Sequence, residues 1–543
     1  MSEREITIEI KSPEVLITII TLLIFFFLDL QVMFNNPVVF GDEGYHGRVA
    51  QLIAKNVEYP VWEPVHYTKL EKNAFARQPF LHFVIGSFLF IFGGYEGLIR
   101  FLIPFMAFLT GLAVFILGKE LYNKKVGFIA SIISVTIPAF VTYSVLVYTD
   151  VLVTLFMVMF FLLFVLYSKK NNKIYLVASG IFGALAFLTK VSGFGSFIFV
   201  FFVFIYYLIT KRQFKIFKDY FILFIILILI SSTFFIRNFY YFGTPICGFP
   251  IFSEFLSTEG CRIDNFESKY NFEGRGPDVG TEQSLYKMGI MNYLNFAYGY
   301  IPIFGFLGNF VILGLFAGLF ILLSNRGKND IFILLILLIF LIVFIYVAFG
   351  RAEDTARFTL AWSPFIAIVS AKWFEEVYNF IKRYQRYLAL VIFIFVIVLS
   401  YQNLKDKLDV MAKVKQFSPS FFEACDWVKE NLPENVTLTL IWGHRAVYNC
   451  ERNAVGHSAD IFLSRDINYT KEVAEKLGIT HIFIQKFGLS FDKAYSEQYK
   501  VDSLQFFEEH PETFKKVYEN GPPLQQCIQQ GGCDGNIIYE IVL

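Results

Sequence analysis

The chain alternates long apolar runs with short charged turns as far as Tyr401, and the pattern stops there. An α-helix needs about 20 apolar residues to cross a bilayer. Runs of this kind predict eleven transmembrane helices, at residues 15–33, 97–117, 127–146, 150–167, 174–190, 192–210, 219–241, 300–323, 331–349, 358–375 and 387–401.

The apolar run Pro79–Gly94 is shorter than a span requires, so the charges of the loops decide how it lies. If it crossed the bilayer, the basic loops that follow would face outward, although Lys and Arg favour the cytoplasmic side. If it lies flat in the interface, those loops face inward. They carry Lys119, Lys124 and Lys125; Lys169, Lys170 and Lys173; Lys211, Arg212, Lys215 and Lys218; Arg326 and Lys328; and Lys382, Arg383 and Arg386. We therefore expect a flat helix, a cytoplasmic N-terminus and an outer C-terminus.

This topology gathers three large segments on the outer face: residues 34–96, residues 242–299 and everything after Tyr401. Residues 402–543 mix charges with short apolar stretches such as VTLTLIWG, which predicts a small α/β domain. The expected fold is a polytopic α-helical membrane protein over residues 1–401, with horizontal interfacial helices, followed by an extracytoplasmic α/β domain over 402–543.

All six cysteines fall in these outer segments, where disulfides can form. Their neighbourhood in the sequence favours the pairs Cys247–Cys261, Cys425–Cys450 and Cys527–Cys533. Two Asn-x-Thr sequons, at Asn435 and Asn468, also lie outside. The cysteines and sequons agree with the topology that the charges predict.

Composition excludes several classes of protein. Hydrophobic residues make up 56% of the chain, aromatic residues 19% and charged residues 17%. The net charge of +1 gives no basic footprint for nucleic acid. The sequence contains no Walker or dinucleotide glycine motif, so nucleotide-driven transport has no support. The expected partners are lipids and molecules presented at the membrane.

Ionisable residues converge on the outer ends of the predicted spans. Charge near hydrocarbon costs several kcal/mol, so it is usually retained for a function. Two adjacent acids among several bases suggest acid/base chemistry beside an anion site. The candidates are Asp42, Glu43, Arg77, Arg100, Asp150, Lys190, Arg237 and Arg357.

Simpler interpretations exist for most of these residues. An Arg at a span end, such as Arg100, is often an anchor that reaches to the headgroups. Asp150 fits a helix N-cap, and the Asp42-Glu43 pair fits a solvated turn. His46, His66 and His82 match no metal-ligand spacing, so we predict no metal site, although a divalent metal stays open.

Several short motifs in order resemble a known superfamily. They are GDEGYHGRVAQLI (41–53), ARQPFLHFVIGSF (76–88), YTDVLVTLFMV (148–158), IFGALAFLTKVSG (181–193), FFIRNFYYFGTPI (234–246) and ARFTLAWSPFIAI (356–368). The pattern resembles the glycosyltransferases of the C-type fold that use polyprenyl-phosphate sugars. Within that superfamily it is similar to the dolichyl-phosphate-mannose protein mannosyltransferases and the lipid A aminoarabinose transferases.

The resemblance implies that Asp42 is the catalytic aspartate and Glu43 its partner. Relatives carry a basic residue, commonly lysine, just before a proline; here the stretch reads Arg-Gln-Pro, and the resemblance implies that Arg77 contacts lipid phosphate. Oligosaccharyltransferases of the same fold carry a Trp-Trp-Asp motif, which this sequence lacks. Transfer of a preassembled oligosaccharide is therefore disfavoured.

The expected reaction moves a sugar from a polyprenyl-phosphate donor to an acceptor hydroxyl at the outer face of the cell membrane, with inversion. A carboxylate would take the acceptor proton, and cations would hold the departing phosphate. Arg77, Arg100, Lys190 and Arg237 are candidates for the phosphate clamp, and no nucleotide or redox cofactor is required. The acceptor is a protein, a glycan or a lipid. Two alternatives stay open: a transporter or flippase for lipid-linked glycans, and a catalytically silent membrane scaffold.

Overall fold

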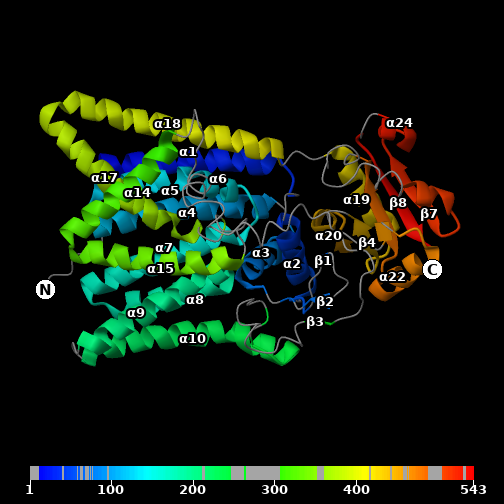
Figure 1. Ribbon diagram of the computed structural model, residues 1–543, viewed down its shortest axis with the longest axis horizontal. Coiled ribbons are helices and arrows are strands. Elements are labelled where there is room, and N and C mark those ends of the chain that lie inside the picture. The colour runs from blue at the N-terminus through cyan, green and yellow to red at the C-terminus, as the bar shows by residue number, and fades with distance from the viewer. Residues whose placement is uncertain are drawn as a thin grey trace.

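Figure 1 shows two parts, a bundle of long helices that starts at the N-terminus and an α/β region that ends at the C-terminus. This computed structural model describes residues 12–38, 42–57, 59–61, 65–67, 72–73, 75, 77–94, 97–210, 214–245, 247, 262–263, 306–350, 357, 360–414, 418–440, 443–456, 461–462, 464–486, 504–529 and 533–543. The predicted fold class, apolar helices followed by an α/β region, is confirmed in this outline.

Each predicted span overlaps a helix of the bundle. The helices are α1 (Pro13–Asn35), α4 (Gly97–Leu121), α5 (Lys124–Thr136) with α6 (Pro138–Ser144), α7 (Thr149–Lys170), α8 (Lys173–Thr189), α9 (Gly195–Thr210), α10 (Phe214–Phe242), α14 (Phe306–Asn325), α15 (Lys328–Gly350), α17 (Ser363–Tyr384) and α18 (Arg386–Val414). Among the described residues, four helices are long and apolar enough to cross a membrane, or five if α5 with α6 is one span. The number eleven therefore stays a prediction.

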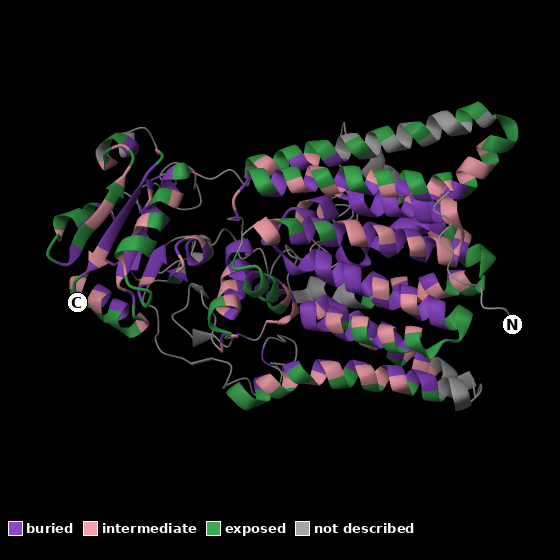
Figure 2. Cartoon of the chain, turned by 180° about the vertical axis from the view of Figure 1, so that it is seen from behind, coloured by how far each residue is buried: buried purple, intermediate pink, exposed green. Residues whose placement is uncertain are grey.

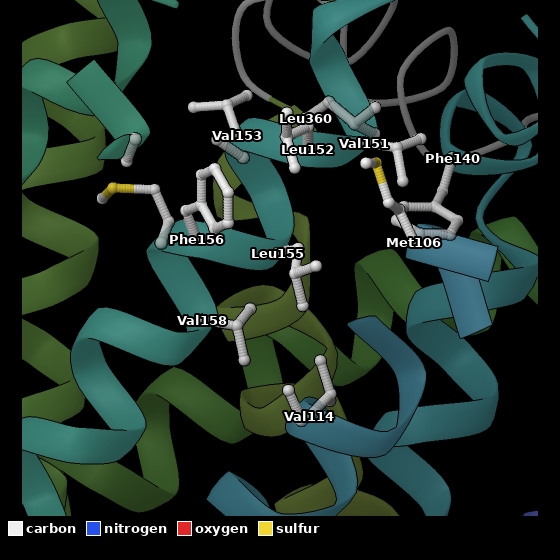
Figure 3. Close-up of a cluster of buried hydrophobic side chains, with 14 of the residues drawn as sticks. Met106, Val114, Phe140, Val151, Leu152, Val153, Leu155, Phe156, Val158 and Leu360 are labelled. Carbon is white, nitrogen blue, oxygen red and sulfur yellow. The ribbon is translucent and has the colours of Figure 1, made fainter. Parts of the chain in front are cut away.

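The core of the bundle forms around α7, most of whose residues are buried. Figure 3 shows Val151, Leu152, Leu155, Phe156 and Val158 of this helix among side chains from its neighbours. Aromatic rings such as Phe161 and Phe199, 5.0 Å apart and nearly perpendicular, fill the space between helices. Through Val151 and Leu152, this core also holds the first turn of α7, where Asp150 lies.

A proline breaks the span between residues 127 and 146. Pro138 has no amide hydrogen to continue α5, so it begins the new helix α6, and the two axes meet at 66°. The chain then passes through Val147 and Tyr148 before α7 begins. This bend brings both residues beside the acid pair described below.

The apolar run after Pro79 forms α3 (Phe80–Ile91). Its 12 residues span about 18 Å, less than the hydrocarbon thickness of about 30 Å. It packs against α2 (Glu43–Asn56), and Figure 1 places both helices where the bundle meets the α/β region. The flat orientation in the membrane stays a prediction.

The α/β region is built on a mixed sheet of β4 (Thr437–Leu440), β5 (Asn453–Gly456), β6 (His481–Gln485), β7 (Phe514–Asn520) and β8 (Asn536–Ile541). With β1 (Val65–Tyr67), the sheet order is β1-β5-β4-β6-β8-β7. β1, β5, β4 and β6 pair in parallel. β8 pairs antiparallel with β6, and β7 pairs antiparallel with β8. The accompanying helices are α19 (Pro419–Asn431), α20 (Gly443–Asn449), α22 (Ile467–Leu477) and α24 (Leu524–Gln529).

One edge strand of this sheet comes from the segment between α1 and α4. β1 (Val65–Tyr67) pairs in parallel with β5, so that Val65 faces Ala454 and Tyr67 faces Gly456. Two residues of the same segment, β2 (Lys72–Asn73), pair antiparallel with β3 (Arg262–Ile263), which follows α10. Most of residues 242–299 lies outside the described residues. The pairs β1–β5 and β2–β3 therefore join segments that are distant in the sequence.

α18 continues to Val414, so this helix extends beyond residue 401, where the last predicted span ends.

Two of the predicted disulfides are confirmed: Cys425 bonds to Cys450 and Cys527 bonds to Cys533. Cys247 is also disulfide-bonded, and its predicted partner, Cys261, lies outside the described residues.

Candidate active site

Asp42 lies directly before α2 and leaves its carboxylate available for distant partners. Its backbone carbonyl accepts the amide hydrogen of His46 at 2.9 Å, which starts the helix. Its side chain makes no capping hydrogen bond, although aspartate often does so at this position. About a quarter of that side chain, 26%, stays exposed.

Glu43, the next residue, is fully buried. Its Oε1 accepts the backbone N–H of Val147 at 3.0 Å, in the turn between α6 and α7. The same turn holds Asp42, because the Asp42 amide donates to the Tyr148 hydroxyl oxygen at 2.8 Å. The two acids therefore differ in role: Glu43 fastens α2 to the bundle, and Asp42 faces the site.

A chain of four charged groups runs through the site. Nη1 of Arg357 lies 3.0 Å from Oδ2 of Asp42, and its Nε lies 3.1 Å from Oδ2 of Asp150. The other carboxylate oxygen of Asp150 lies 2.5 Å from Nζ of Lys190. Asp150 has no exposed side-chain surface, and Lys190 has 9%. Asp150 is therefore an ion-pair partner, and Tyr148, rather than Asp150, is the N-cap residue of α7.

Local chain geometry presents Lys190 to Asp150. α8 ends at Thr189, and Lys190 is extended before the short 3-10 helix η1 (Val191–Phe194) turns back. A Cβ at Gly193 would lie 2.2 Å from the backbone carbon of Ala186, so only glycine fits this turn. The Lys-Val-Ser-Gly sequence thus aims the ammonium at the start of α7.

Charge and burial act against each other at Asp42 and Arg357. Burial alone would raise the pKa of Asp42, but the positive charges of Arg77 and Arg357 outweigh it and hold that pKa below its usual range. Burial would likewise lower the pKa of Arg357, but Asp150 and Asp42 hold it above the usual range. Both groups are therefore ionised at neutral pH. Burial and the Asp42 charge raise the pKa of Tyr148, so its hydroxyl keeps its proton.

Arg77 reaches the same site from the segment between α2 and α3. Its guanidinium carbon lies 4.1 Å from the centre of the Tyr45 ring, a cation–π contact, and its charge acts on Asp42. Arg237 supports the loop that carries Arg77. It donates to the carbonyls of Phe75 at 2.9 Å and Pro60 at 2.7 Å.

Arg100 lies at the start of α4, where Nη1 donates to the carbonyl of Phe34 at 3.2 Å. The structure therefore gathers Asp42, Glu43, Arg77, Asp150, Lys190 and Arg357 around one point. Arg100 donates instead to the Phe34 carbonyl, and Arg237 donates to the carbonyls of Phe75 and Pro60 and to the side-chain oxygen of Asn238.

Two features of the site were not predicted from the sequence. Tyr148 holds the Asp42 amide and lies under Arg357, 4.4 Å from its guanidinium carbon. His46 and His82 bond directly, Nδ1 to Nε2, at 2.8 Å, and tie α2 to α3. Tyr148 precedes Asp150 within the YTD motif, which was the available signal. Across the described part of the chain, no three His, Cys, Asp or Glu residues lie together as metal ligands.

A family model supports the similarity seen in the sequence. Residues 76–235 match the dolichyl-phosphate-mannose-protein mannosyltransferases. Among curated proteins, no sequence matches the chain significantly.

Two solved structures share the fold of nearly the whole chain. The archaeal oligosaccharyltransferase AglB from Archaeoglobus fulgidus, in complex with an inhibitory peptide and a dolichol-phosphate, has 14% identity and a TM-score of 0.63 over 93% of this chain and 73% of that one. ArnT from Cupriavidus metallidurans, bound to undecaprenyl phosphate, has 11% identity and a TM-score of 0.60 over 97% and 98%. The resemblance is confirmed: the chain has the C-type glycosyltransferase fold and is similar, over residues 76–235, to the dolichyl-phosphate-mannose-protein mannosyltransferases.

Proposed function

We propose that this protein is a membrane glycosyltransferase that moves a sugar from a polyprenyl phosphate to an acceptor hydroxyl. The observation that carries the proposal is the contact of Arg357 with both Asp42 and Asp150. It places a carboxylate that is not used for capping beside a cluster of cations, which is the combination that such a transfer needs.

The reaction proceeds as a direct displacement. The acceptor oxygen attacks the anomeric carbon of the sugar, and the bond from that carbon to the phosphate oxygen breaks. The acceptor proton passes to the Asp42 carboxylate, and the lipid leaves as a polyprenyl phosphate monoester. With one base and no enzyme-bound nucleophile, the sugar carbon inverts. Glu43 positions α2, because it is buried and accepts the Val147 amide hydrogen.

The phosphate clamp consists of Arg357, Lys190 and Arg77. Arg357 is shared between two carboxylates, and a donor phosphate competes for the same guanidinium N–H groups. Binding of the donor then draws positive charge away from Asp42. Since that charge holds the pKa of Asp42 low, the carboxylate becomes a stronger base when the donor is present.

The donor class follows from the fold. The similar structures were solved with dolichol-phosphate and with undecaprenyl phosphate, and the matching family is described by its use of dolichyl-phosphate mannose. We infer that the lipid phosphate lies at the outer end of the bundle, beside α2. The protein then spans a cell membrane several times, with a cytoplasmic N-terminus and its α/β region outside.

Lipid binding and transfer by purified protein in lipid nanodiscs test the proposal. Binding is measured with dolichyl phosphate and undecaprenyl phosphate, and dolichol, which lacks the phosphate, is the matched control. Transfer is measured from labelled dolichyl-phosphate mannose, glucose and pentose donors, as label on peptide, glycan or lipid acceptors and as released dolichyl phosphate. We expect the phosphate forms to bind more tightly than dolichol and one donor to be consumed. Equal binding of dolichol and dolichyl phosphate, with no donor consumed, would overturn the proposal.

A further inference from the structure

Four consecutive residues of the α/β region, Tyr448–Glu451, bind the elements that carry Asp42. Tyr448 at the end of α20 is buried against Gly47 of α2. A Cβ on Gly47 would lie 2.6 Å from Cδ2 of Tyr448, so α20 could not approach α2 if this residue had a side chain. The next residue, Asn449, donates from Nδ2 to the carbonyl of Val38 at 3.3 Å. Gly47 and Val38 lie on either side of Asp42 in the sequence.

The last two residues of the segment make further links, one to α19 and one to α2. Cys450 is bonded to Cys425 of α19, which fastens the end of α20 to the α/β region. Glu451 forms an ion pair with Lys55 in the last turn of α2. The segment therefore contacts α2 near its beginning and at its end.

Behind the segment, α2 and the α/β region share one hydrophobic core. Tyr45, Val49 and Ile53 of α2 pack there with Phe75 and with residues of the α/β region. These include Phe421, Cys425, Val428, Ala446 and Cys450. Tyr45 is also the ring beneath Arg77. A shift of this core would move both the base and one of the phosphate-binding cations.

The second disulfide of the α/β region belongs to a different core. Cys527 and Cys533 pack with residues such as Ile461, Phe507 and Val473, the last of which belongs to α22. The chain thus offers two disulfides in one region, of which one lies in the core shared with α2.

We propose that the 448–451 segment positions Asp42 for transfer, which makes the α/β region part of the transfer site. This inference rests on the proposed function. Tyr448 and Asn449 are positioning residues, because they act on the reaction through α2 and the Val38 backbone. A misplacement of about 1 Å at reacting groups can cost about 10²-fold in rate, so small shifts of α2 are enough.

The two disulfides provide the main test. Cys425→Ser with Cys450→Ser is compared with Cys527→Ser with Cys533→Ser, under non-reducing conditions in nanodiscs. The readouts are kcat for release of dolichyl phosphate from the donor that the wild type consumes, the Kd for dolichyl phosphate, and the folded fraction. The first pair should lose about 10²-fold in kcat with a much smaller change in Kd, because two of the three cations of the clamp, Lys190 and Arg357, are held by Asp150 of α7 outside this core. The second pair should keep wild-type kcat.

A milder pair of variants decides the case if the first disulfide variant fails to fold. Asn449→Ala removes one hydrogen bond to a backbone carbonyl at the site. Asn329→Ala removes a bond of the same kind, to Leu121, between α15 and the end of α4. We expect Asn449→Ala to lower kcat and Asn329→Ala to leave it unchanged at equal folded fraction.

The outcomes separate this inference from the proposed function. A wild type that consumes no donor contradicts the function and this inference together. A wild type that transfers sugar, while Asn449→Ala and the Cys425–Cys450 variant keep its kcat, contradicts the inference alone. Equal loss of kcat on removal of either disulfide would also overturn it.

Discussion

Nη1 of Arg357 lies 3.0 Å from Oδ2 of Asp42, a residue 315 positions earlier in the chain. The same guanidinium bonds to Asp150 through Nε, so it bridges the start of α7 and the start of α2. The planar guanidinium can serve two carboxylates at fixed angles, which a lysine ammonium does not do with the same geometry. The bridge therefore ties α2 to α7 at the candidate site.

Arg357→Lys should weaken lipid phosphate binding while the charge is preserved. It removes hydrogen bonds between charged groups, which are worth about 1.5–3 kcal/mol each, so the Kd for dolichyl phosphate should rise about 10- to 100-fold. Arg326→Lys, at an exposed arginine that bonds to the Leu323 carbonyl, is the matched control and should bind normally. Equal affinity of both variants for dolichyl phosphate would remove Arg357 from the clamp.

Lys190 and Asp150 should behave as a coupled pair in unfolding experiments. Lys190→Met leaves the buried Asp150 carboxylate with one cation fewer, and breaking a buried ion pair costs about 3–5 kcal/mol. Because Arg357 still contacts Asp150, the loss should fall at the lower end. Adding Asp150→Asn should recover part of the free energy of unfolding. Strictly additive losses in the double variant would show that the two side chains do not interact.

The buried histidine pair should make the protein less stable in acid. Burial, with a contribution from the Arg77 charge, lowers the pKa of His82 from 6.5 to about 3, and burial also lowers the pKa of His46. As the pH falls below the unfolded-state value, the unfolded chain takes up protons that the folded chain does not. The free energy of unfolding should then fall by up to about 1.4 kcal/mol per pH unit for each histidine.

His82→Asn tests this effect in denaturation between about pH 7 and pH 5. The variant keeps a polar side chain that does not titrate, so its stability should depend less steeply on pH than that of the wild type. An unchanged slope would mean that another group dominates the acid response.

The pH dependence of kcat/KM should reveal the cations around Asp42. A base works only when it is deprotonated, so activity is lost as the pH falls through its pKa in the free enzyme. Arg77 and Arg357 hold that pKa below the usual carboxylate range, and the acid limb should lie there. Arg77→Gln removes one of these charges and should move the limb upward, toward the ordinary range of an aspartate. An acid limb that does not move in Arg77→Gln would contradict the electrostatic coupling.

The sequence pattern was sufficient for elements that form from local composition. Apolar runs of span length predicted the helices of the bundle, because hydrocarbon requires a continuous apolar surface. No knowledge of distant partners was needed, since a helix forms its backbone hydrogen bonds within its own segment. Outer-face cysteines at short sequence distance predicted both described disulfides in the α/β region. The motifs also indicated which acids and bases to examine.

Features that depend on contacts between distant parts of the chain could not be predicted from the sequence pattern. β1 has only three residues, and it becomes a strand because β5 offers a free edge. The continuation of α18 beyond Tyr401 is polar, so hydropathy gave no sign that the helix continues to Val414. The bridge from Arg357 to two acids and the bond from His46 to His82 join segments whose proximity follows from tertiary packing.

The most direct test of the account is sugar transfer by Asp42→Asn, with donor binding measured on the same preparation. Asparagine has nearly the shape of aspartate but cannot take the acceptor proton, and a positioned base is worth about 10²–10⁴-fold in rate. We predict a loss of transfer of that size while the Kd for dolichyl phosphate stays close to that of the wild type. Asp42→Asn that transfers sugar at the wild-type rate would contradict the assignment of Asp42 as the base.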